Sequence, residues 1–172
     1  PVGCAKCHST TGFHDYLGVD GSAAGSVETA PAVGTVVSCT ACHNSATKDM
    51  TSVTFASSGK TVSGLGHETA CISCHQGVES KKSVDDYIAA AAVADDDAKS
   101  ASLGFKNVHY MAAGAVQFGK TAQVGYEYAG KTYAAKFNHV EGVGSCNDCH
   151  NPHTLEVNVE TCKTCHTDVA TK

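Results

Sequence analysis

The sequence has no tryptophan and few of the other large side chains that usually fill a protein core. Among its 172 residues, 6% are aromatic and two are methionine, so the chain can bury little apolar surface by itself. No stretch of the sequence is long and apolar enough to span a membrane. The formal net charge of −5 argues against a nucleic-acid partner, because phosphate backbones attract basic surfaces. Residues 1–172 have the length of a single domain, but that domain needs something besides its own side chains to complete a core.

Cysteine is abundant by contrast, and every cysteine belongs to one short pattern. The 10 cysteines form five Cys-x-x-Cys-His motifs, numbered here in chain order: Cys4, Cys7 and His8 (motif 1); Cys39, Cys42 and His43 (motif 2); Cys71, Cys74 and His75 (motif 3); Cys146, Cys149 and His150 (motif 4); Cys162, Cys165 and His166 (motif 5). This pattern attaches haem c: the two thiols form thioethers with the haem vinyl groups, and the histidine binds the iron.

Disulfides and zinc sites are the alternatives for paired cysteines. Neither requires a histidine directly after the second cysteine, and the irregular gaps between the motifs do not suggest paired zinc half-sites. The sequence therefore predicts five covalently bound haems c. Five porphyrins would also supply the apolar surface that the chain lacks, so we expect folding to depend on the cofactors.

Five histidines lie outside the motifs, one for each predicted haem. They are His14, His67, His109, His139 and His153. If each binds one iron opposite a motif histidine, every iron has two imidazole ligands and no open position. Such haems lack the thioether ligand that raises the potential of His/Met cytochromes, so we expect low-potential one-electron carriers. Met50 and Met111 are alternative ligands for one iron, and a distal histidine that bound no iron would leave one haem open.

Chain length limits which haem each distal histidine reaches. His153 lies three residues after His150, and three residues span about 10 Å at most. We therefore expect His153 to bind a different iron and to bridge two stacked haems. His67 and His139 precede motifs 3 and 4 and are expected to fold over those haems. For His14 two partners remain open: an iron of its own chain, or the haem of motif 5 in a neighbouring subunit.

The segments between the motifs predict little regular structure. Glycines favour a loop over 18–34, and 33–38 fits a short strand. Alternating apolar residues predict hairpins over 51–63 and 124–137, the second with Tyr126 and Tyr128 facing Tyr133. Helices are expected from an N-cap at Ser83 to a last turn at Lys99, and over 107–116 around His109. The predicted fold class is mostly irregular coil, with short α-helices and small β-hairpins wrapped around a chain of five haems.

The five motifs, the five additional histidines and the run Cys149-His150-Asn151-Pro152-His153 resemble the multihaem c-type cytochromes. They are similar to extracellular members, some of which polymerise into filaments known as cytochrome nanowires. This resemblance implies electron transport through bis-histidine haems, an extracellular or cell-surface location, redox partner proteins or external electron acceptors, and head-to-tail self-association. Because this haem is attached outside the cytoplasmic membrane, we expect an export signal to have been removed before Pro1.

The sequence differs from the pentahaem nitrite reductases, whose catalytic haem uses Cys-x-x-Cys-Lys. All five motifs here end in histidine, which favours an electron-transfer protein over an enzyme. The alternatives are a multihaem oxidoreductase with one open iron, and a monomeric periplasmic electron shuttle.

Overall fold

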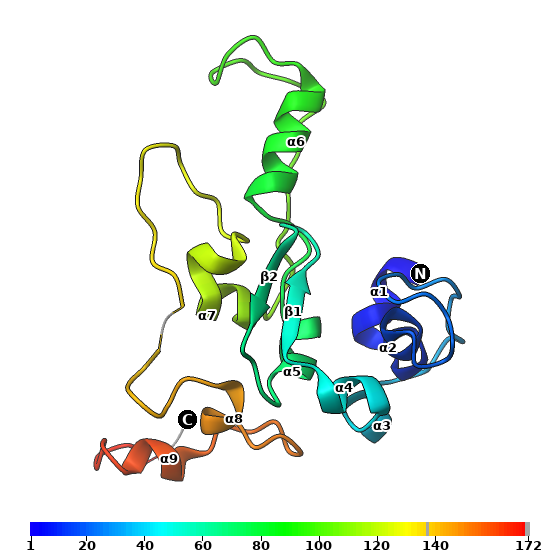
Figure 1. Ribbon diagram of the computed structural model, residues 1–172. Helices are drawn as coiled ribbons and strands as arrows, with labels where there is room; N and C mark the ends of the chain where they lie inside the picture. Colours follow the sequence, from blue (N-terminus) through cyan, green and yellow to red (C-terminus); the bar gives the residue numbers. More distant parts are fainter. Residues whose placement is uncertain (137, 171–172) are drawn as a thin grey trace.

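The polypeptide consists of short helices and a two-stranded sheet joined by long irregular segments (Figure 1). The structure is a computed structural model that describes residues 1–136 and 138–170. In chain order the elements are α1 (Val2–His8), α2 (Thr10–Leu17), α3 (Cys39–Cys42), α4 (Ser45–Asp49), β1 (Ser52–Phe55), β2 (Lys60–Ser63), α5 (Thr69–Cys74), α6 (Lys81–Ala91), α7 (Ala113–Ala122), α8 (Cys146–Cys149) and α9 (Val159–Lys163). Within these residues, no helix is both long and apolar enough to cross a membrane.

The predicted hairpin over 51–63 is confirmed. Strands β1 and β2 pair antiparallel, with Val53 opposite Val62. Both valines are buried, whereas Thr54 and Thr61 share a hydrogen bond of 2.9 Å on the exposed face. The sheet is therefore apolar on one face and polar on the other, as expected for a hairpin that covers a core on one side.

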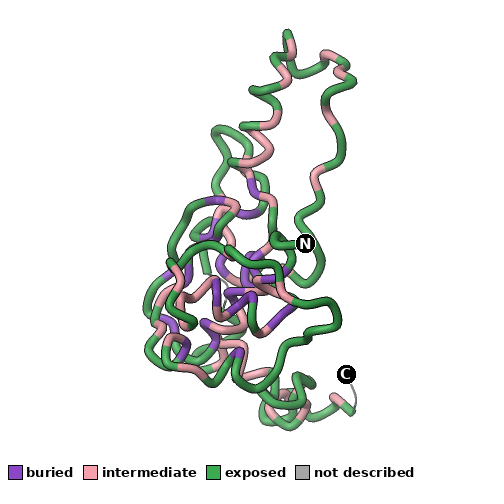
Figure 2. The backbone as a smooth tube through the Cα atoms, turned by 90° about the vertical axis from the view of Figure 1, so that its right-hand side faces the viewer, coloured by how far each residue is buried: buried purple, intermediate pink, exposed green. Residues whose placement is uncertain are grey.

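The hydrophobic core is small and lies between this hairpin, α5 and α7. It consists of Val53, Phe55, Val62, Leu65, Ile72, Ala115, Phe118, Ala122 and Val124. The rings of Phe55 and Phe118 meet edge to face at 6.4 Å between centroids. Buried residues gather in the body of the molecule, while the arm has only intermediate and exposed residues (Figure 2). The accessible surface is 11190 Å², against about 7,900 Å² for a compact monomer of this mass, so the polypeptide alone is far from close-packed.

Motif 1 is held in a helical pair that packs tightly on itself. Ser9 caps α2 by accepting a hydrogen bond from the backbone N–H of Gly12 at 3.2 Å. A Cβ placed on Gly12 would lie 2.5 Å from the carbonyl oxygen of Ala5 in α1, so only glycine permits this approach. The predicted loop over 18–34 is observed, and the carboxylate of Asp15 anchors it by accepting N–H bonds from Glu28 and Thr29.

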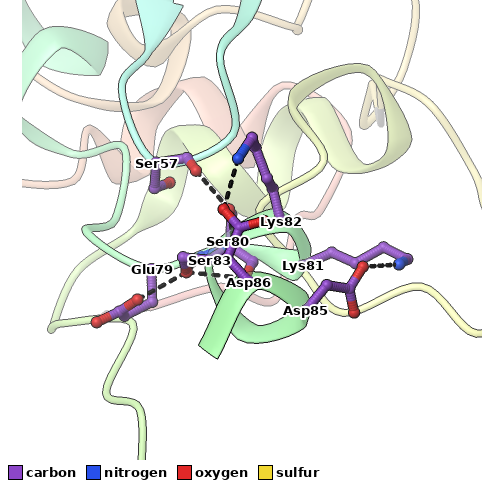
Figure 3. A network of polar contacts seen from close by, with 8 residues as sticks. All are labelled: Ser57, Glu79, Ser80, Lys81, Lys82, Ser83, Asp85 and Asp86. Carbon is purple, nitrogen blue, oxygen red and sulfur yellow. Dashed lines mark hydrogen bonds and ion pairs between the residues drawn. The ribbon is translucent and has the colours of Figure 1, made fainter. Parts of the chain in front are cut away.

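Helix α6 forms an arm that extends away from the body (Figures 1 and 2). Its N-cap is Ser80 rather than the predicted Ser83, which instead completes a capping box with Ser80. The hydroxyl of Ser80 also donates to the carbonyl oxygen of Ser57 at 2.6 Å, which ties the arm to the hairpin turn (Figure 3). Ion pairs Lys81–Asp85 and Lys82–Asp86 follow along the helix. No residue of α6 is buried, so local capping and ion pairs, rather than packing, support it.

Two predicted helix boundaries were wrong for reasons that the backbone shows. Helix α6 ends at Ala91, where Ala92 adopts a left-handed conformation (φ 48°), so Lys99 lies beyond it. The helix expected over 107–116 begins only at Ala113. His109 (φ 76°) and Met111 (φ 54°) are also left-handed, which is incompatible with an α-helix and directs the chain around a turn.

Two predicted β-segments are also absent from the described residues. Residues 33–38 form no strand, since Val36 offers its carbonyl oxygen to Thr10 of α2 instead of to a partner strand. Residues 124–136 form a loop in which Tyr126 contacts Tyr128 edge to face and the backbone N–H of Tyr128 donates to the hydroxyl of Tyr133. Side-chain contacts therefore replace the expected ladder; the last position of that prediction, Phe137, lies outside the described residues.

Candidate haem-binding sites

In motifs 2 to 5 the backbone makes the same helical turn. The N–H of the motif histidine donates to the carbonyl oxygen of the first cysteine at 2.8–2.9 Å; the histidines are His43, His75, His150 and His166. In motif 1 the same residues lie in α1. A turn of this kind brings side chains three positions apart onto one face, so both thiols can reach one porphyrin edge while the histidine turns under the ring.

Three distal histidines lie beside motif histidines at one common spacing. The ring centroids are 6.1 Å apart for His8 and His109, 6.1 Å for His43 and His153, and 6.0 Å for His166 and His139. A metal–imidazole bond is about 2 Å long and the ring centre lies about 1 Å further, so imidazoles on opposite sides of one metal have centroids about 6 Å apart. Each pair therefore fits one six-coordinate haem iron.

These contacts join residues that are distant in sequence, and they change one assignment. His153 lies against His43 of motif 2, not against His150, in keeping with the reach argument. The expectation for His139 was wrong: it lies against His166 of motif 5 rather than over motif 4. Motifs 4 and 5 are close in space, because the N–H of Asn158, at the start of α9, donates to the carbonyl oxygen of Cys149 at 2.8 Å. His139 can therefore reach motif 5 although motif 4 is nearer to it in sequence.

The two motif histidines outside these pairs are oriented by backbone carbonyls. Nδ1 of His75 lies 2.8 Å from the carbonyl oxygen of Met111, and Nδ1 of His150 lies 3.2 Å from that of Leu155. A carbonyl oxygen only accepts, so Nδ1 carries the proton and Nε2 keeps the lone pair that binds a metal. This is the arrangement expected of a haem ligand.

His14 is oriented in the opposite way. Its Nε2 lies 2.8 Å from the carbonyl oxygen of Thr40, inside motif 2. By the same reasoning Nε2 carries the proton, so His14 must release Thr40 before that nitrogen can bind an iron. His14 and His67 are the two distal histidines that do not belong to the three pairs.

Cysteines from different motifs meet around α5, which carries motif 3. The thiol of Cys7 donates to the carbonyl oxygen of Cys74 at 3.8 Å, and that of Cys74 donates to the carbonyl oxygen of Lys6 at 3.9 Å. A hydrogen bond from the Cys74 thiol lowers the pKa of Cys7 to about 6, and one from Cys146 lowers the pKa of Cys71 to about 6. The same hydrogen bonds raise the pKa of the two donor thiols, Cys74 and Cys146.

These contacts have two consequences. Before haem is attached, Cys7 and Cys71 ionise more readily than an ordinary cysteine, and the thiolate is the reactive form of cysteine. The contacts also place motif 1 and motif 4 beside motif 3. The porphyrin edge of motif 3 would therefore lie next to those of motifs 1 and 4.

The surface around the histidines suits an apolar ligand. Tyr110 and Met111, next to His109, are 79% and 78% exposed, and Leu155, whose carbonyl faces His150, is 71% exposed. Large apolar side chains in such numbers on a surface mark contact sites. A porphyrin bound by the adjacent histidines would cover them.

No protein-family model matches the sequence, and no solved structure matches it. Two curated proteins of Geobacter sulfurreducens do. The C-type polyheme cytochrome OmcB is 27% identical over 222 residues, covering 95% of this chain and 28% of its own length. The C-type polyheme cytochrome OmcC is 30% identical over 191 residues, covering 86% of this chain and 23% of its own length. The chain thus spans about a quarter of the length of these relatives, and with its five attachment motifs it belongs to the multihaem c-type cytochromes.

Proposed function

We propose that this chain is an electron-transfer protein that carries five covalently bound haems c, each closed by two histidines. The observation that carries the proposal is the common spacing of 6.0–6.1 Å between three motif histidines and three distal histidines. Iron with two imidazole ligands has no open position, so a small substrate cannot bind without displacing one of them. The haem supplies the one-electron chemistry, and the protein fixes spacing, orientation and electrostatics.

The ligand assignment follows from these pairs. His8 and His109 hold the iron of motif 1, His43 and His153 that of motif 2, and His166 and His139 that of motif 5. His75 of motif 3 and His150 of motif 4 then take His14 and His67 as their distal ligands. The protons on Nδ1 of His75 and His150 support Nε2 coordination at both irons.

Spectroscopy of the oxidised holoprotein tests this proposal directly. Five bis-histidine haems give only low-spin ferric signals, and the reduced protein does not bind carbon monoxide at neutral pH. A high-spin signal from one haem in five, together with carbon monoxide binding, would instead support the competing function, a multihaem oxidoreductase with one open iron.

The proposed setting is outside the cytoplasm, at the cell surface or beyond it, with redox proteins or external acceptors as partners. Haem c attachment outside the cytoplasmic membrane and the resemblance to extracellular multihaem cytochromes support this setting. A monomeric periplasmic shuttle is the alternative. Fractionation of cells that express the protein, followed by haem staining, separates the two.

Head-to-tail self-association into a filament remains a prediction. Helix α1 carries the first motif and α9 carries the first cysteine of the last motif, and the two helices lie far apart (Figure 1). Cys4 and Cys165 are exposed, which suits haem contacts between subunits. A heterologous contact of this kind propagates unless it closes into a ring. Coordination of a neighbour's motif 5 haem by His14 would require loss of the bond to Thr40 and displacement of His139 from its place beside His166. Light scattering of the holoprotein and its His14→Ala variant tests the idea; monomers at all concentrations exclude the filament.

A further inference from the structure

We infer that motif 4 is a branch point, at which the haem on Cys146 and Cys149 lies against the haems of motifs 2, 3 and 5, so that electrons do not pass through the haems in sequence order. This inference deepens the proposed function and rests on it. It is supported by three separate contacts of the motif 4 segment, each with a different partner.

The first contact joins motif 4 to motif 2. The ring of His153 lies 6.1 Å from that of His43, with the two planes 12° apart. His153 follows His150 by three residues, which span about 10 Å at most. One short stretch therefore carries a ligand for the motif 4 iron and a ligand for the motif 2 iron. The porphyrins of motifs 2 and 4 would be in contact or close to it, because their ligands His153 and His150 lie within about 10 Å of each other.

The second contact joins motif 4 to motif 3. Cys146 packs against the buried cluster that contains Ile72, the neighbour of Cys71 in α5, and each of Cys71 and Cys146 shifts the pKa of the other. In a c-type haem these sulfurs are bonded to the porphyrin edge. The packing of Cys146 beside motif 3 would therefore bring the edges of the two porphyrins together.

The third contact joins motif 4 to motif 5. The backbone N–H of Asn158 donates to the carbonyl oxygen of Cys149 at 2.8 Å, and Asn158 caps α9, which carries Cys162. A β-bridge between His150 and Val157 fixes the same approach. The distal ligand of motif 5, His139, reaches it from the segment just before motif 4.

Motif 1 contacts motif 3 instead, through the bonds that Cys7 and Cys74 exchange with each other's helices. In the resulting order the haem of motif 1 is followed by that of motif 3 and then by that of motif 4. The haems of motifs 2 and 5 each lie next to that of motif 4, on separate branches. In a linear chain by sequence, motif 2 would instead lie between motifs 1 and 3.

Selective reduction of single haems tests this order. A methionine ligand raises the potential of a haem, so His153→Met, His139→Met and His109→Met make the haems of motifs 2, 5 and 1, respectively, the first to accept an electron. A haem that becomes ferrous and low-spin loses its electron spin, and the electron paramagnetic resonance signal of each ferric neighbour then sharpens.

The branched order predicts that the same ferric signal, that of motif 4, sharpens in the one-electron-reduced His153→Met and His139→Met proteins, and that it does not sharpen in His109→Met. A linear order by sequence predicts no signal shared by the first two variants, because motif 2 would then neighbour motifs 1 and 3 and motif 5 would neighbour motif 4. That result would overturn the inference. A holoprotein structure provides a second measurement: contact of the motif 4 haem with three haems supports the branch point, and contact with only two excludes it. Failure of the proposed function is distinguishable, because it appears in the unaltered protein as high-spin iron.

Discussion

The imidazole rings of His43 and His153 lie 6.1 Å apart and nearly parallel, although most of the chain separates the two residues. The contact joins the second motif to the segment that follows the fourth. Ligand exchange at one iron would therefore loosen two distant parts of the chain at once.

Paired histidine variants test this contact through the number of haems that they affect. If His43 and His153 bind one iron, the double variant His43→Ala/His153→Ala changes a single haem, and four low-spin signals remain. The matched variant His150→Ala/His153→Ala changes two irons, and three remain. Electron paramagnetic resonance of the oxidised proteins counts the signals. Three remaining signals in the first variant would place the two histidines on different irons.

The number of attached haems is a second prediction. Because every cysteine belongs to an attachment motif, the mature protein should have the mass of the 17.6 kDa polypeptide plus five haems. Intact-mass spectrometry measures this, and treatment of the denatured protein with a thiol reagent should add nothing further. A mass with four haems and two alkylated cysteines would remove one motif from the proposal.

Two glycines of the first helical pair should respond in opposite ways to the same substitution. Gly12→Ala places a methyl group 2.5 Å from the carbonyl oxygen of Ala5, and overpacking of this kind costs about 1–3 kcal/mol. Gly3 lies in α1 with nothing within 4 Å of a Cβ, so Gly3→Ala should stabilise the helix by up to about 1 kcal/mol. Urea unfolding of the holoprotein measures both. Equal unfolding midpoints for the two variants would show that the approach of α1 to α2 is not tight.

Acid should weaken the start of α8. The carboxylate of Asp148 accepts N–H bonds from Ser145 at 2.7 Å and Gly144 at 2.9 Å, and these bonds lower its pKa below the usual value. Since the folded pKa is below the unfolded one, the stabilisation is fully present above the unfolded pKa of about 4 and is lost as the pH falls through the folded pKa.

Asp148→Ala should therefore lower stability at neutral pH and reduce the further loss on acidification below pH 4, as followed by circular dichroism of the holoprotein. Glu141→Ala is the control, because it removes an exposed acidic side chain from the same segment without removing a helix cap. Identical acid-unfolding curves for Asp148→Ala and the unaltered protein would contradict the prediction.

Local patterns in the sequence were enough to predict several features. The five attachment motifs are defined by spacing alone, and the hairpin of β1 and β2 is defined by alternation around a glycine turn. The ring of His153 lies beside that of His43 rather than His150, which agrees with the short reach of three residues; that His150 and His153 bind different irons stays a prediction.

Other features depend on distant residues and could not be read from local patterns. The segment 33–38 has the β-branched residues of a strand but no partner strand beside it. The segment 107–112 was predicted to be helical but turns through two left-handed residues, His109 and Met111, and the ring of His109 lies beside that of His8. The contact of His139 with His166 depends on the docking of motif 5 against Cys149, which no local pattern indicates.

The arm formed by α6 and the residues up to Lys106 contains no cysteine and no histidine, and it leaves and rejoins the body at the Glu79–Lys106 ion pair. It accounts for much of the sequence between motifs 3 and 4, although Cys146 of motif 4 packs against the buried cluster that contains Ile72 of motif 3. The number of residues between motifs 3 and 4 thus does not determine how far apart their haems would lie. A peptide tag inserted among the exposed aspartates Asp95–Asp97 would give a handle for immobilising the protein on an electrode in one orientation, with its redox centres unaltered.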